Sequence, residues 1–520
     1  MGLFVEIQNQ LVAATGLPAQ KLYLYAALFL VTAIFLLLQR GQKQVNGKLP
    51  PHVPSPIPWF GNAVAYGIQP VKFLEKCREQ YGDMFTFTMI GRKMTFALGP
   101  EGNHFLFNVK LAHATAEGAY DKLTVPVFGE GVVYDVENSI FMEQKKFVKD
   151  ALTTTAFRTY IPIIRKEAQD FFKSWADQSD KFELFPEMAE LTIRTASHCL
   201  MGKEIREQLH QQANVAQLYH HLDQGFQPIN VFIRNLPLPN YWNRDKANKT
   251  MTELFLRILK NRRASGTENQ HDVLESLMNS TYRDGSRMTD TDVAHMMIAT
   301  LMAGQHTSST TVSWILFELA NNPHVIPELI KEQSEVLTGK PDTPISDLPD
   351  FDYDQLRKMP LLECVMKETL RLHPPIHTVM RLVVKDLEYK GYTIPAGHFI
   401  CGSQAVSQMD PTRYPEPEKF DPWRHMGSEE GSGEWTINGV DIAQKSAKSH
   451  FLPFGAGRHR CIGEAFAYIQ IKTIIATFLR EFEHDLLKND KGENIFPPMD
   501  FTSLIVMPQK PSYISYRRRK

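Results

Sequence analysis

The stretch from residue 454 to residue 463 reads Phe-Gly-Ala-Gly-Arg-His-Arg-Cys-Ile-Gly. Its three glycines allow a tight backbone and the close approach of a flat ligand. Three consecutive basic residues in its middle raise the local positive potential, and the pattern from Glu464 to Leu479 predicts a helix. Because a thiol at the start of a helix receives amide donors and a favourable dipole, we expect Cys461 to be held as a thiolate.

The other cysteines of the chain carry no such context. A lone cysteine is usually a small buried hydrophobic residue, and we interpret four of them in this way, namely Cys77, Cys199, Cys364 and Cys401. The absence of a CxxC spacing excludes a disulfide framework and a zinc site, and it indicates a reducing compartment. The formal net charge of -1, from 57 basic and 58 acidic residues, argues against a protein that mainly binds nucleic acid phosphates.

A second informative segment precedes the glycine-rich loop. The sequence predicts a helix that begins after Pro360, ends before Pro374 and contains Glu368-Thr-Leu-Arg371. A spacing of three places Glu368 and Arg371 on one helix face, where such a pair is ordinarily a solvent-exposed ion pair. The later motif Phe420-Asp-Pro-Trp-Arg424 supplies a second arginine. A glutamate shared by two arginines would lock the Cys461 loop in place.

The third segment is a long helix predicted from about Thr289 to Asn322. It opens with a Thr-x-x-Asp capping box, is closed by Pro323, and is apolar almost all round, so at about 45 Å it must cross the core. In its middle, residues 303–308 read Ala-Gly-Gln-His-Thr-Ser, where the small residues leave room for a ligand. The hydroxyl of Thr307 can compete for carbonyls four residues back and open the helix locally. A packing glycine and an internally satisfied threonine are the alternative.

The N-terminus predicts a membrane anchor over residues 1–48. Residues 22–38 are uncharged and long enough to cross a thin bilayer as a helix, and residues 1–18 suit a helix lying in the membrane interface. Basic residues after the span place the bulk of the chain in the cytosol. A cleaved signal peptide is the alternative, but Glu6 and the basic segment Gln39–Lys43 fit it poorly.

The sequence predicts one catalytic domain over residues 49–520. Long helical patterns dominate it, whereas Asp386–Ser403 predicts short hairpin strands and Gly427–Ser449 predicts a surface insertion. The expected fold class is therefore mainly α with small β-sheets.

In this order, the three segments resemble those of the cytochrome P-450 family of haem-thiolate monooxygenases, from about residue 50 to the C-terminus. The resemblance implies the cytochrome P-450 fold and haem b as cofactor, with Cys461 as the axial ligand of the iron. The loop around this cysteine would include Phe454, Gly455 and Gly463. Glu368, Arg371 and Arg424 match the family's structural charge triad.

Two departures from the common family pattern narrow the resemblance. His459 stands where most members have arginine, and His306 stands where most have an acid before the threonine. Both substitutions look like the sterol 14α-demethylase subfamily, and so does Tyr120–Tyr134, which is similar to its substrate-recognition signature. The stretches Asp223–Asn230 and Leu236–Trp242 look like its fungal branch.

The resemblance also assigns residues to ligands. The haem propionates would be held by Tyr120, Tyr134, Lys145, Arg381 and His459. For Lys145 the alternative is a solvated basic face, which also suits docking of an acidic electron donor. The sterol cavity would be large and apolar. Its lining would be Leu123, Phe128, Val133, Tyr134, Phe226, Gly304, Ile376, His377, Thr378 and Leu504, several of which would pass equally for plain core residues.

The implied reaction is removal of the 14α-methyl group of lanosterol- or eburicol-type sterols, in ergosterol biosynthesis. Three successive oxidations, each using O2, take the methyl group to alcohol and aldehyde and release it as formate. Electrons would come from NADPH through NADPH–cytochrome P-450 reductase, at the endoplasmic reticulum membrane, and azole inhibitors would bind the haem iron. Without an acid at position 306, we expect His306 and Thr307 to relay protons, with Asp223 as the surface partner of the histidine.

Three other functions remain open at this point. One is a different microsomal monooxygenase, acting on fatty acids or xenobiotics. Another is a haem-thiolate enzyme that rearranges a hydroperoxide without a reductase, and the third is a non-catalytic sterol or haem carrier. His306 and the Tyr120–Tyr134 stretch count against the first, and Thr307 counts against the second. A mere carrier has little need of a thiolate and a proton relay together.

Overall fold

The computed structural model describes residues 47–55, 57, 59–175, 180–211, 215–231, 234–235, 237–265, 272–426 and 447–519. The predicted interfacial helix 1–18 and transmembrane helix 22–38 lie outside these ranges, as does most of the predicted insertion at Gly427–Ser449. Within the part that the structure describes, no helix combines the length and the apolar character needed to cross a membrane.

The first half of the domain is built mostly of helices with short strands between them. In chain order its elements are α3 (Ala63–Ile68), α4 (Pro70–Tyr81), β1 (Met84–Met89), β2 (Arg92–Ala97), α5 (Gly99–Asn108), β3 (Ala114–Thr115), α6 (Glu117–Phe128), η1 (Val133–Asp135), α7 (Asn138–Asp150), α8 (Thr154–Phe172), β4 (Asp180–Glu183), α9 (Leu184–Met201), α10 (Lys203–Gln211), α11 (Val215–Asp223), η2 (Gln224–Phe226), η3 (Pro228–Val231), α12 (Pro239–Ser265) and α13 (Val273–Asn279).

The second half begins with the longest helix. Its elements are α14 (Asp290–Asn321), α15 (Val325–Thr338), η4 (Ile345–Asp347), α16 (Tyr353–Arg357), α17 (Pro360–Leu372), β5 (Val379–Val383), β6 (Leu387–Tyr389), β7 (Tyr392–Ile394), β8 (Phe399–Gly402), α18 (Gln404–Gln408), η5 (Pro422–His425), η7 (Gly457–His459), α19 (Glu464–Glu481), β9 (Phe482–Leu486), β10 (Met499–Asp500), β11 (Met507–Pro508) and β12 (Tyr513–Arg518).

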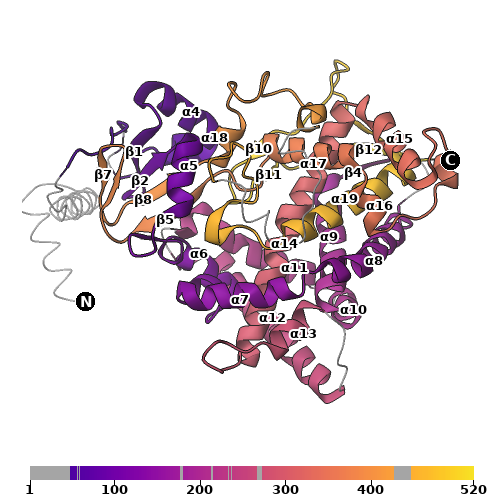
Figure 1. The fold of residues 1–520 in the computed structure, drawn as a ribbon, viewed down its shortest axis with the longest axis horizontal. Coiled ribbons are helices and arrows are strands. Elements are labelled where there is room, and N and C mark those ends of the chain that lie inside the picture. Colours follow the sequence, from indigo (N-terminus) through magenta and orange to yellow (C-terminus); the bar gives the residue numbers. More distant parts are fainter. Residues whose placement is uncertain are drawn as a thin grey trace, which may run out of the picture.

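The strands gather in small sheets at the edges of the helical mass. The largest has the order β1-β2-β8-β5-β3, in which β2 and β8 are parallel and the other neighbours antiparallel. It occupies the left of Figure 1, away from the helices α8, α15 and α16. A three-stranded sheet, β4-β12-β9, lies at the opposite end, and β6-β7 and β10-β11 are two-stranded. The mainly helical fold with small sheets is therefore confirmed.

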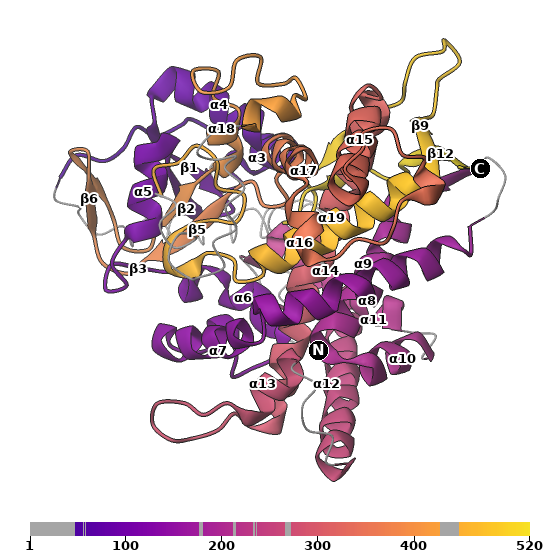
Figure 2. The same cartoon turned by 45° about the vertical axis from the view of Figure 1, so that its right-hand side comes forward.

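Helix α14 forms the axis of the domain. Its 32 residues correspond to about 48 Å, and most of those from Val293 to Ala320 are buried. Thr289 and Asp292 form the predicted capping box, and the helix ends just before Pro323. In Figures 1 and 2 it runs through the middle of the molecule, with α9 and α19 beside it. Because α14 crosses the core, polar residues on its buried faces are held away from bulk water.

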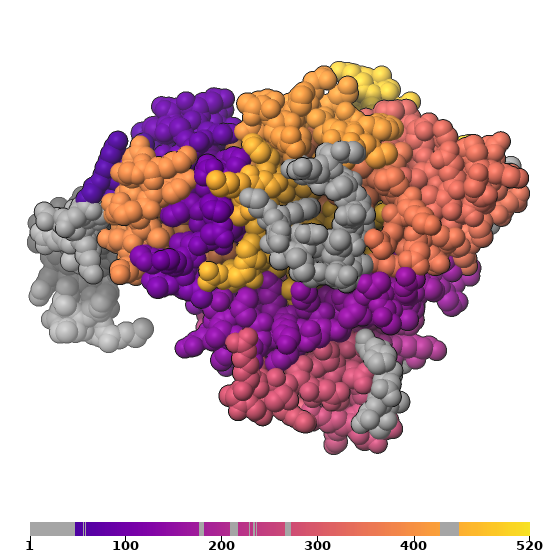
Figure 3. Space-filling view, in the orientation of Figure 1, coloured from indigo at the N-terminus to yellow at the C-terminus, as the bar shows by residue number. Residues whose placement is uncertain are grey.

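The other elements predicted around the three segments are present. Helix α17 begins at Pro360, and α19 begins at Glu464 and continues two residues beyond the expected end. The predicted hairpin is β6-β7, and β8 joins the large sheet next to β5. The glycine-rich loop before α19 therefore lies between the large sheet and the helices. Gold atoms, which belong to the chain after residue 446, reach the surface between the indigo and orange part and the salmon part in Figure 3.

Candidate active site

The glycine-rich loop closes on itself immediately before α19. The backbone N–H of Cys461 donates to the carbonyl of Phe454 at 3.0 Å. Gly455 and Gly457 have φ values of 69° and 64°, which a residue with a Cβ rarely adopts. A Cβ at Gly457 would also lie 2.7 Å from the carbonyl oxygen of Phe107. The glycines thus permit a sharp loop that leaves Cys461 exposed, unlike the four other cysteines, which are buried.

Opposing influences act on the pKa of the Cys461 thiol. Burial raises the pKa of its thiol and Glu464 raises it further, while the Gly463 N–H, Lys145 and Arg460 oppose the rise. In the protein alone, desolvation therefore outweighs the helix start and the basic residues, and a thiolate at Cys461 stays a prediction. Direct coordination to a metal ion is what deprotonates such a thiol.

Lys145, from α7, is tied to the same loop. Its Nζ donates to the carbonyls of Arg458 and Arg460 at 2.8 and 2.6 Å. Burial lowers the pKa of Lys145 to about 8. The side chain is half-buried, so it is not part of a solvated face, whereas Lys146 and Lys149 on the same helix are exposed. In the protein alone, the ammonium group of Lys145 braces the backbone of the Cys461 loop.

Two tyrosines and an arginine form a compact cluster next to this loop. The rings of Tyr120 and Tyr134 stack with centroids 5.4 Å apart, and the Tyr120 hydroxyl accepts the N–H of Met380 at 3.0 Å. Burial raises the pKa of both phenols, that of Tyr134 to about 12, while the positive charge of Arg381 opposes the rise. The sheet places Arg381 here, since β5 continues from the end of α17 past both rings.

The cluster carries positive charge without a matching carboxylate. Arg381 is 6% exposed, and within the described residues its guanidinium donates to the Met380 carbonyl at 2.7 Å and forms no ion pair with a carboxylate. His459 lies against Tyr134 and Phe141, and its buried Nδ1 has no partner among the described residues. Burial lowers the pKa of His459 to about 3, and Arg381, Lys145 and Arg458 lower it as well. Such a set of donors fits a ligand that brings carboxylates, as haem does with its two propionates.

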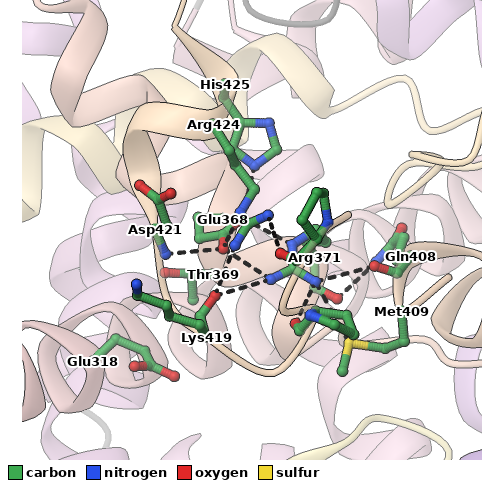
Figure 4. Close-up of polar contacts among 12 residues, drawn as sticks. Glu318, Glu368, Thr369, Arg371, Gln408, Met409, Lys419, Asp421, Arg424 and His425 are labelled. Atoms are coloured by element: carbon green, nitrogen blue, oxygen red, sulfur yellow. Dashed lines mark hydrogen bonds and ion pairs between the residues drawn. The ribbon is translucent and has the colours of Figure 1, made fainter. Parts of the chain in front are cut away.

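Glu368 stands at the centre of a saturated polar cluster (Figure 4). Arg371 donates to both carboxylate oxygens at 2.8 and 2.9 Å, and Arg424 donates to Oε1 at 2.9 Å. The backbone N–H of Asp421 reaches Oε1 at 3.0 Å, and His425 Nε2 lies 2.8 Å from Oε2. Burial raises the pKa of Glu368, but the hydrogen bonds from Arg371 and His425 outweigh it, and the pKa falls to about 2. Glu368 is therefore shared between two arginines.

One side chain connects this cluster to the Cys461 loop. Gln408 donates to the carbonyls of Leu370 and Arg371 at 2.9 and 3.1 Å, and its Oε1 accepts the N–H of Leu452 at 3.3 Å. Arg371 in turn donates to the carbonyls of Gln408 and Pro417. The charge cluster thus fixes the segment that leads into the Cys461 loop, at Leu452, two residues before Phe454.

The centre of α14 presents an open face. Ala303 is exposed although Met302 and Gln305 are buried, and a Cβ at half-buried Gly304 would meet no atom within 4 Å. The hydroxyl of Thr307 donates to the Ala303 carbonyl at 2.9 Å, which is the competition for a carbonyl four residues back that the sequence predicts. Exposure in the middle of a core helix indicates unfilled space beside it, which suits a large ligand.

His306 points away from this open face toward α11. Its Nε2 lies 3.2 Å from Oδ1 of Asp223, with the two side chains 9% and 18% exposed. Burial lowers the pKa of His306 and Asp223 raises it, while Lys510 and His220 lower it. Asp223 is the last residue of α11, so the pair lies between the core helix and the surface.

The predicted cavity residues fall into two groups. Phe128 and Phe226 have ring centroids 5.7 Å apart, and the N–H of Leu504 donates to the Phe226 carbonyl at 3.3 Å. These residues also belong to the main hydrophobic core, together with Leu123 and Val133. The second group follows α17: Ile376 is 45% exposed, and His377 Nδ1 lies 2.9 Å from the Thr378 hydroxyl. Burial lowers the pKa of His377 to about 4.

Four residues at the site escaped sequence reasoning. Tyr66 donates to the Thr378 hydroxyl at 3.3 Å, and Phe141 stacks on His459 at 5.7 Å. His425 and Gln408 complete the Glu368 cluster. Only His425, next to Arg424, stood beside a motif, and nothing in its type or spacing distinguished it from a surface histidine.

Comparison with known proteins places these features in a family. The model of the family described as "Cytochrome P450" matches residues 51–516. The chain belongs to the cytochrome P450 family. Its fold agrees with a solved structure titled "Retinoic acid bound cyanobacterial CYP120A1", with a TM-score of 0.76 at 20% identity, over 91% of this chain and 100% of that one.

Among curated proteins, this cytochrome P450 is similar over nearly its whole length to sterol demethylases. It is 45% identical to a lanosterol 14-alpha demethylase of Cunninghamella elegans, over 91% of this chain and 92% of that protein. It is 42% identical to a sterol 14-alpha demethylase of Gibberella zeae, over 100% of both. The human lanosterol 14-alpha demethylase is 42% identical, over 97% of this chain and 94% of that protein.

Proposed function

We propose that this cytochrome P450 is a sterol 14α-demethylase, which removes the 14α-methyl group of a lanosterol- or eburicol-type sterol and releases it as formate. The observation that carries the proposal is the similarity to curated enzymes of that name from fungi and mammals at 42–45% identity along nearly the whole chain. The buried pair of His306 and Asp223 beside Thr307 supports it, because the reaction needs protons delivered into a dry core.

Haem b is the cofactor in this proposal, and it supplies the activation of O2 when bound. Cys461 would hold the iron from the loop before α19, where Phe454, Gly455 and Gly463 leave the sulfur exposed. Arg381, Tyr120, Tyr134, His459 and Lys145 would hold the two propionates. The deficit of carboxylates around Arg381 supports this assignment, because a buried guanidinium without a counter-charge is costly.

Protons would travel from Asp223 to His306 and from there to the hydroxyl of Thr307. Neutral His306 accepts a proton at one ring nitrogen and releases one from the other, with Asp223 stabilising the transient positive charge. Thr307 gives up its hydroxyl proton toward the open face at Gly304 and takes another from the His306 side. The relay replaces the acid that most family members place at position 306.

The sterol would lie along the open face of α14. The cavity wall would be formed by Leu123, Phe128, Val133, Tyr134, Phe226, Gly304, Ile376, His377, Thr378 and Leu504. A neutral His377 is compatible with an apolar ligand, since its low pKa keeps the imidazole uncharged at neutral pH. The ring pair Phe128–Phe226 and Leu504 offer flat apolar surfaces to a rigid skeleton. Azole inhibitors would reach the iron through the same space.

A membrane location is part of the proposal, with residues 1–48 as a single-pass anchor in the endoplasmic reticulum and the catalytic domain in the cytosol. The described chain that follows the anchor supports it. Large apolar side chains are exposed there to fractions of 40–66%, namely Ile57, Trp59, Phe60, Val64 and Ile68. Helix α3 buries none of its residues, which suits contact with lipid. Electrons would come from NADPH through a cytochrome P-450 reductase, and exposed Lys146 and Lys149 suit an acidic partner.

A reconstituted turnover assay tests the function. The protein is mixed with reductase, NADPH and a 14α-methyl sterol, and formate and the 14-demethylated diene are measured together. We expect the two products to appear in step, and none to appear with Cys461→Ser. The thiolate-type carbon monoxide spectrum, recorded on the same preparation, shows whether haem is bound through sulfur.

Other outcomes identify the alternatives. A normal carbon monoxide spectrum without formate, but with hydroxylated fatty acid or xenobiotic, would assign a different monooxygenase. Sterol binding without any NADPH consumption would assign a carrier, and turnover of a hydroperoxide without reductase would assign a rearranging enzyme.

A further inference from the structure

A row of polar side chains runs along α14 beyond the proposed relay. His306, Thr310, Trp314 and Glu318 follow one another at intervals of four residues. Side chains four apart on a helix are neighbours, and the row turns by about 40° per step. All four are at least nine-tenths buried, with exposures of 7%, 0%, 0% and 6%. The relay histidine therefore continues into a buried polar stripe, defined here as these four residues.

Three members of the stripe have polar atoms without a partner. Neither ring nitrogen of His306 makes a hydrogen bond of good geometry, although Asp223 is 3.2 Å away. The hydroxyl of Thr310 and the indole N–H of Trp314 have no partner among the described residues. Other hydroxyl groups on α14 do have partners. Neighbouring hydroxyls donate to backbone carbonyls three or four residues back, namely those of Thr300, Thr307, Ser309, Thr311 and Ser313.

The far end of the stripe is a second buried histidine–carboxylate pair. His373 Nε2 lies 2.7 Å from Oε1 of Glu318, and the side chains are 9% and 7% exposed. The imidazole of His373 stacks on Trp314 with centroids 4.0 Å apart and planes 5° from parallel, and no described residue is a partner of its buried Nδ1. Asn322 donates to Glu318 Oε2 at 3.2 Å and is only half-buried, so a partly exposed residue contacts the pair.

We propose that the stripe is a second, internal proton path, which joins the Glu318–His373 pair to His306 through ordered water held by Thr310 and Trp314. This inference rests on the proposed function, because it supplies the relay at His306. An unpaired buried donor or acceptor costs roughly 1–3 kcal/mol, whereas buried water commonly satisfies such groups. Four unpartnered polar atoms on three members of one row therefore mark a wet path rather than isolated defects.

The chemistry of the path follows from what each group can do. The Thr310 hydroxyl both donates and accepts, so it passes a proton on and takes another. The Trp314 indole only donates, so it anchors a water molecule and keeps its own proton. A proton that leaves His306 toward Thr307 is replaced from the stripe, and the Glu318–His373 pair recovers its proton from solvent beside Asn322. No charge accumulates, since one proton enters for each proton that leaves.

Hydrogen exchange tests the wet path without any turnover. The six tryptophans are labelled with 15N at the indole, and Trp314→Phe identifies the signal of Trp314. We expect its N–H to exchange with D2O much faster than global unfolding allows, and Thr310→Val to slow it. A dry core would protect this N–H as fully as the stability of the domain permits, and that result would overturn the proposal.

Turnover provides the second test, once the wild-type protein has been shown to demethylate a sterol. Thr310→Val keeps the shape and removes the hydroxyl, and Trp314→Phe keeps an aromatic ring for His373 and removes the donor. For each we expect a roughly threefold to tenfold fall in product per NADPH, more hydrogen peroxide and a larger solvent deuterium isotope effect. Ser309→Ala is the control, because its buried hydroxyl already donates to the His306 carbonyl.

The outcomes separate the path from the enzyme function. A wild-type protein without sterol turnover would refute the function and leave the exchange test of the path valid. Coupled turnover in Thr310→Val equal to that of Ser309→Ala would refute the path while leaving the function intact. An unchanged thiolate-type carbon monoxide spectrum in every variant excludes a general loss of structure as the cause.

Discussion

Two buried polar regions of this cytochrome P450 are built on opposite principles. Around Glu368, the carboxylate receives donors from Arg371, Arg424, His425 and the Asp421 backbone, so both oxygens are occupied (Figure 4). Around His306, Asp223 is the charged group in contact within the described part of the chain, where both ring nitrogens lack a well-formed hydrogen bond. Both regions lie in the core, so burial does not explain the difference.

The contrast separates a group that must stay charged from a group that must change its charge. Hydrogen bonds lower the pKa of Glu368 to about 2, so it remains a carboxylate at any physiological pH and fixes the chain entering the Cys461 loop. His306 has opposing influences, since burial lowers its pKa and Asp223 raises it. A saturated cluster is suited to rigidity, whereas an unsaturated one is suited to proton transfer.

The largest expected effect comes from removing the carboxylate at the centre of the Glu368 cluster. Glu368→Ala leaves two arginines buried without their counter-charge, and we expect a loss of about 3–5 kcal/mol in the free energy of unfolding, with loss of bound haem. Urea denaturation followed by circular dichroism measures it. The matched control is Glu483→Ala at an exposed pair with Arg517, where we expect less than about 1 kcal/mol. Equal losses in the two variants would contradict the structural role of Glu368.

The acid response of the same cluster sharpens the comparison. Because the pKa of Glu368 is lower in the folded state than the ordinary value of 4.5, its contribution is complete above that value and is lost as the pH falls toward about 2. The shift corresponds to about 3 kcal/mol. Unfolding free energies between pH 6 and about pH 3 should fall more steeply for the wild-type protein than for Glu368→Gln. Parallel curves would show that other carboxylates dominate acid unfolding.

A smaller effect, on activity alone, is expected at the unsaturated site. His306→Ala removes the proposed proton carrier, and we expect a roughly hundredfold fall in coupled product formation with the unfolding free energy changed far less than in Glu368→Ala. His306→Asp restores the acid that most family members carry and should recover part of the loss. Full, coupled turnover in the alanine variant would end the relay assignment.

The sequence predicted local features of the fold well. The capping box at Thr289 and the helix start at Pro360 follow from residue types that act within one turn, so neighbours along the chain suffice. The shared carboxylate of Glu368 also followed from spacing, because three charged residues stood in recognisable motifs. Local rules and the family resemblance together therefore reached the fold class and the residues of the Cys461 loop.

The features that the sequence did not predict depend on contacts between distant segments of the chain. Gln408 links α17 to Leu452, and Tyr66 reaches Thr378 across 312 positions of the chain. The pKa of the Cys461 thiol has the same origin, since the desolvation that raises it comes from the packed domain and not from the loop. The spacing of four residues in the stripe on α14 can be read from the sequence. The burial of these side chains and their missing partners are known only from the structure.

The last prediction concerns how the relay is tuned. Asp223→Asn keeps the shape of the side chain and removes its charge, so the influences left on His306 are burial, Lys510 and His220, and all of them lower its pKa. The protonated form of His306 is then populated only at lower pH. We expect a roughly tenfold loss of coupled turnover near pH 7.5, which is partly recovered on acidification, so the acid-dependent limb of the pH profile moves to lower pH.

Lys510→Met removes a repelling charge instead. It should move that limb slightly to higher pH, because the imidazolium of His306 becomes easier to form. Opposite shifts from two residues on different elements would identify His306 as the titrating group, whereas unmoved profiles in both variants would place the controlling proton elsewhere, in contrast to the fixed charge at Glu368.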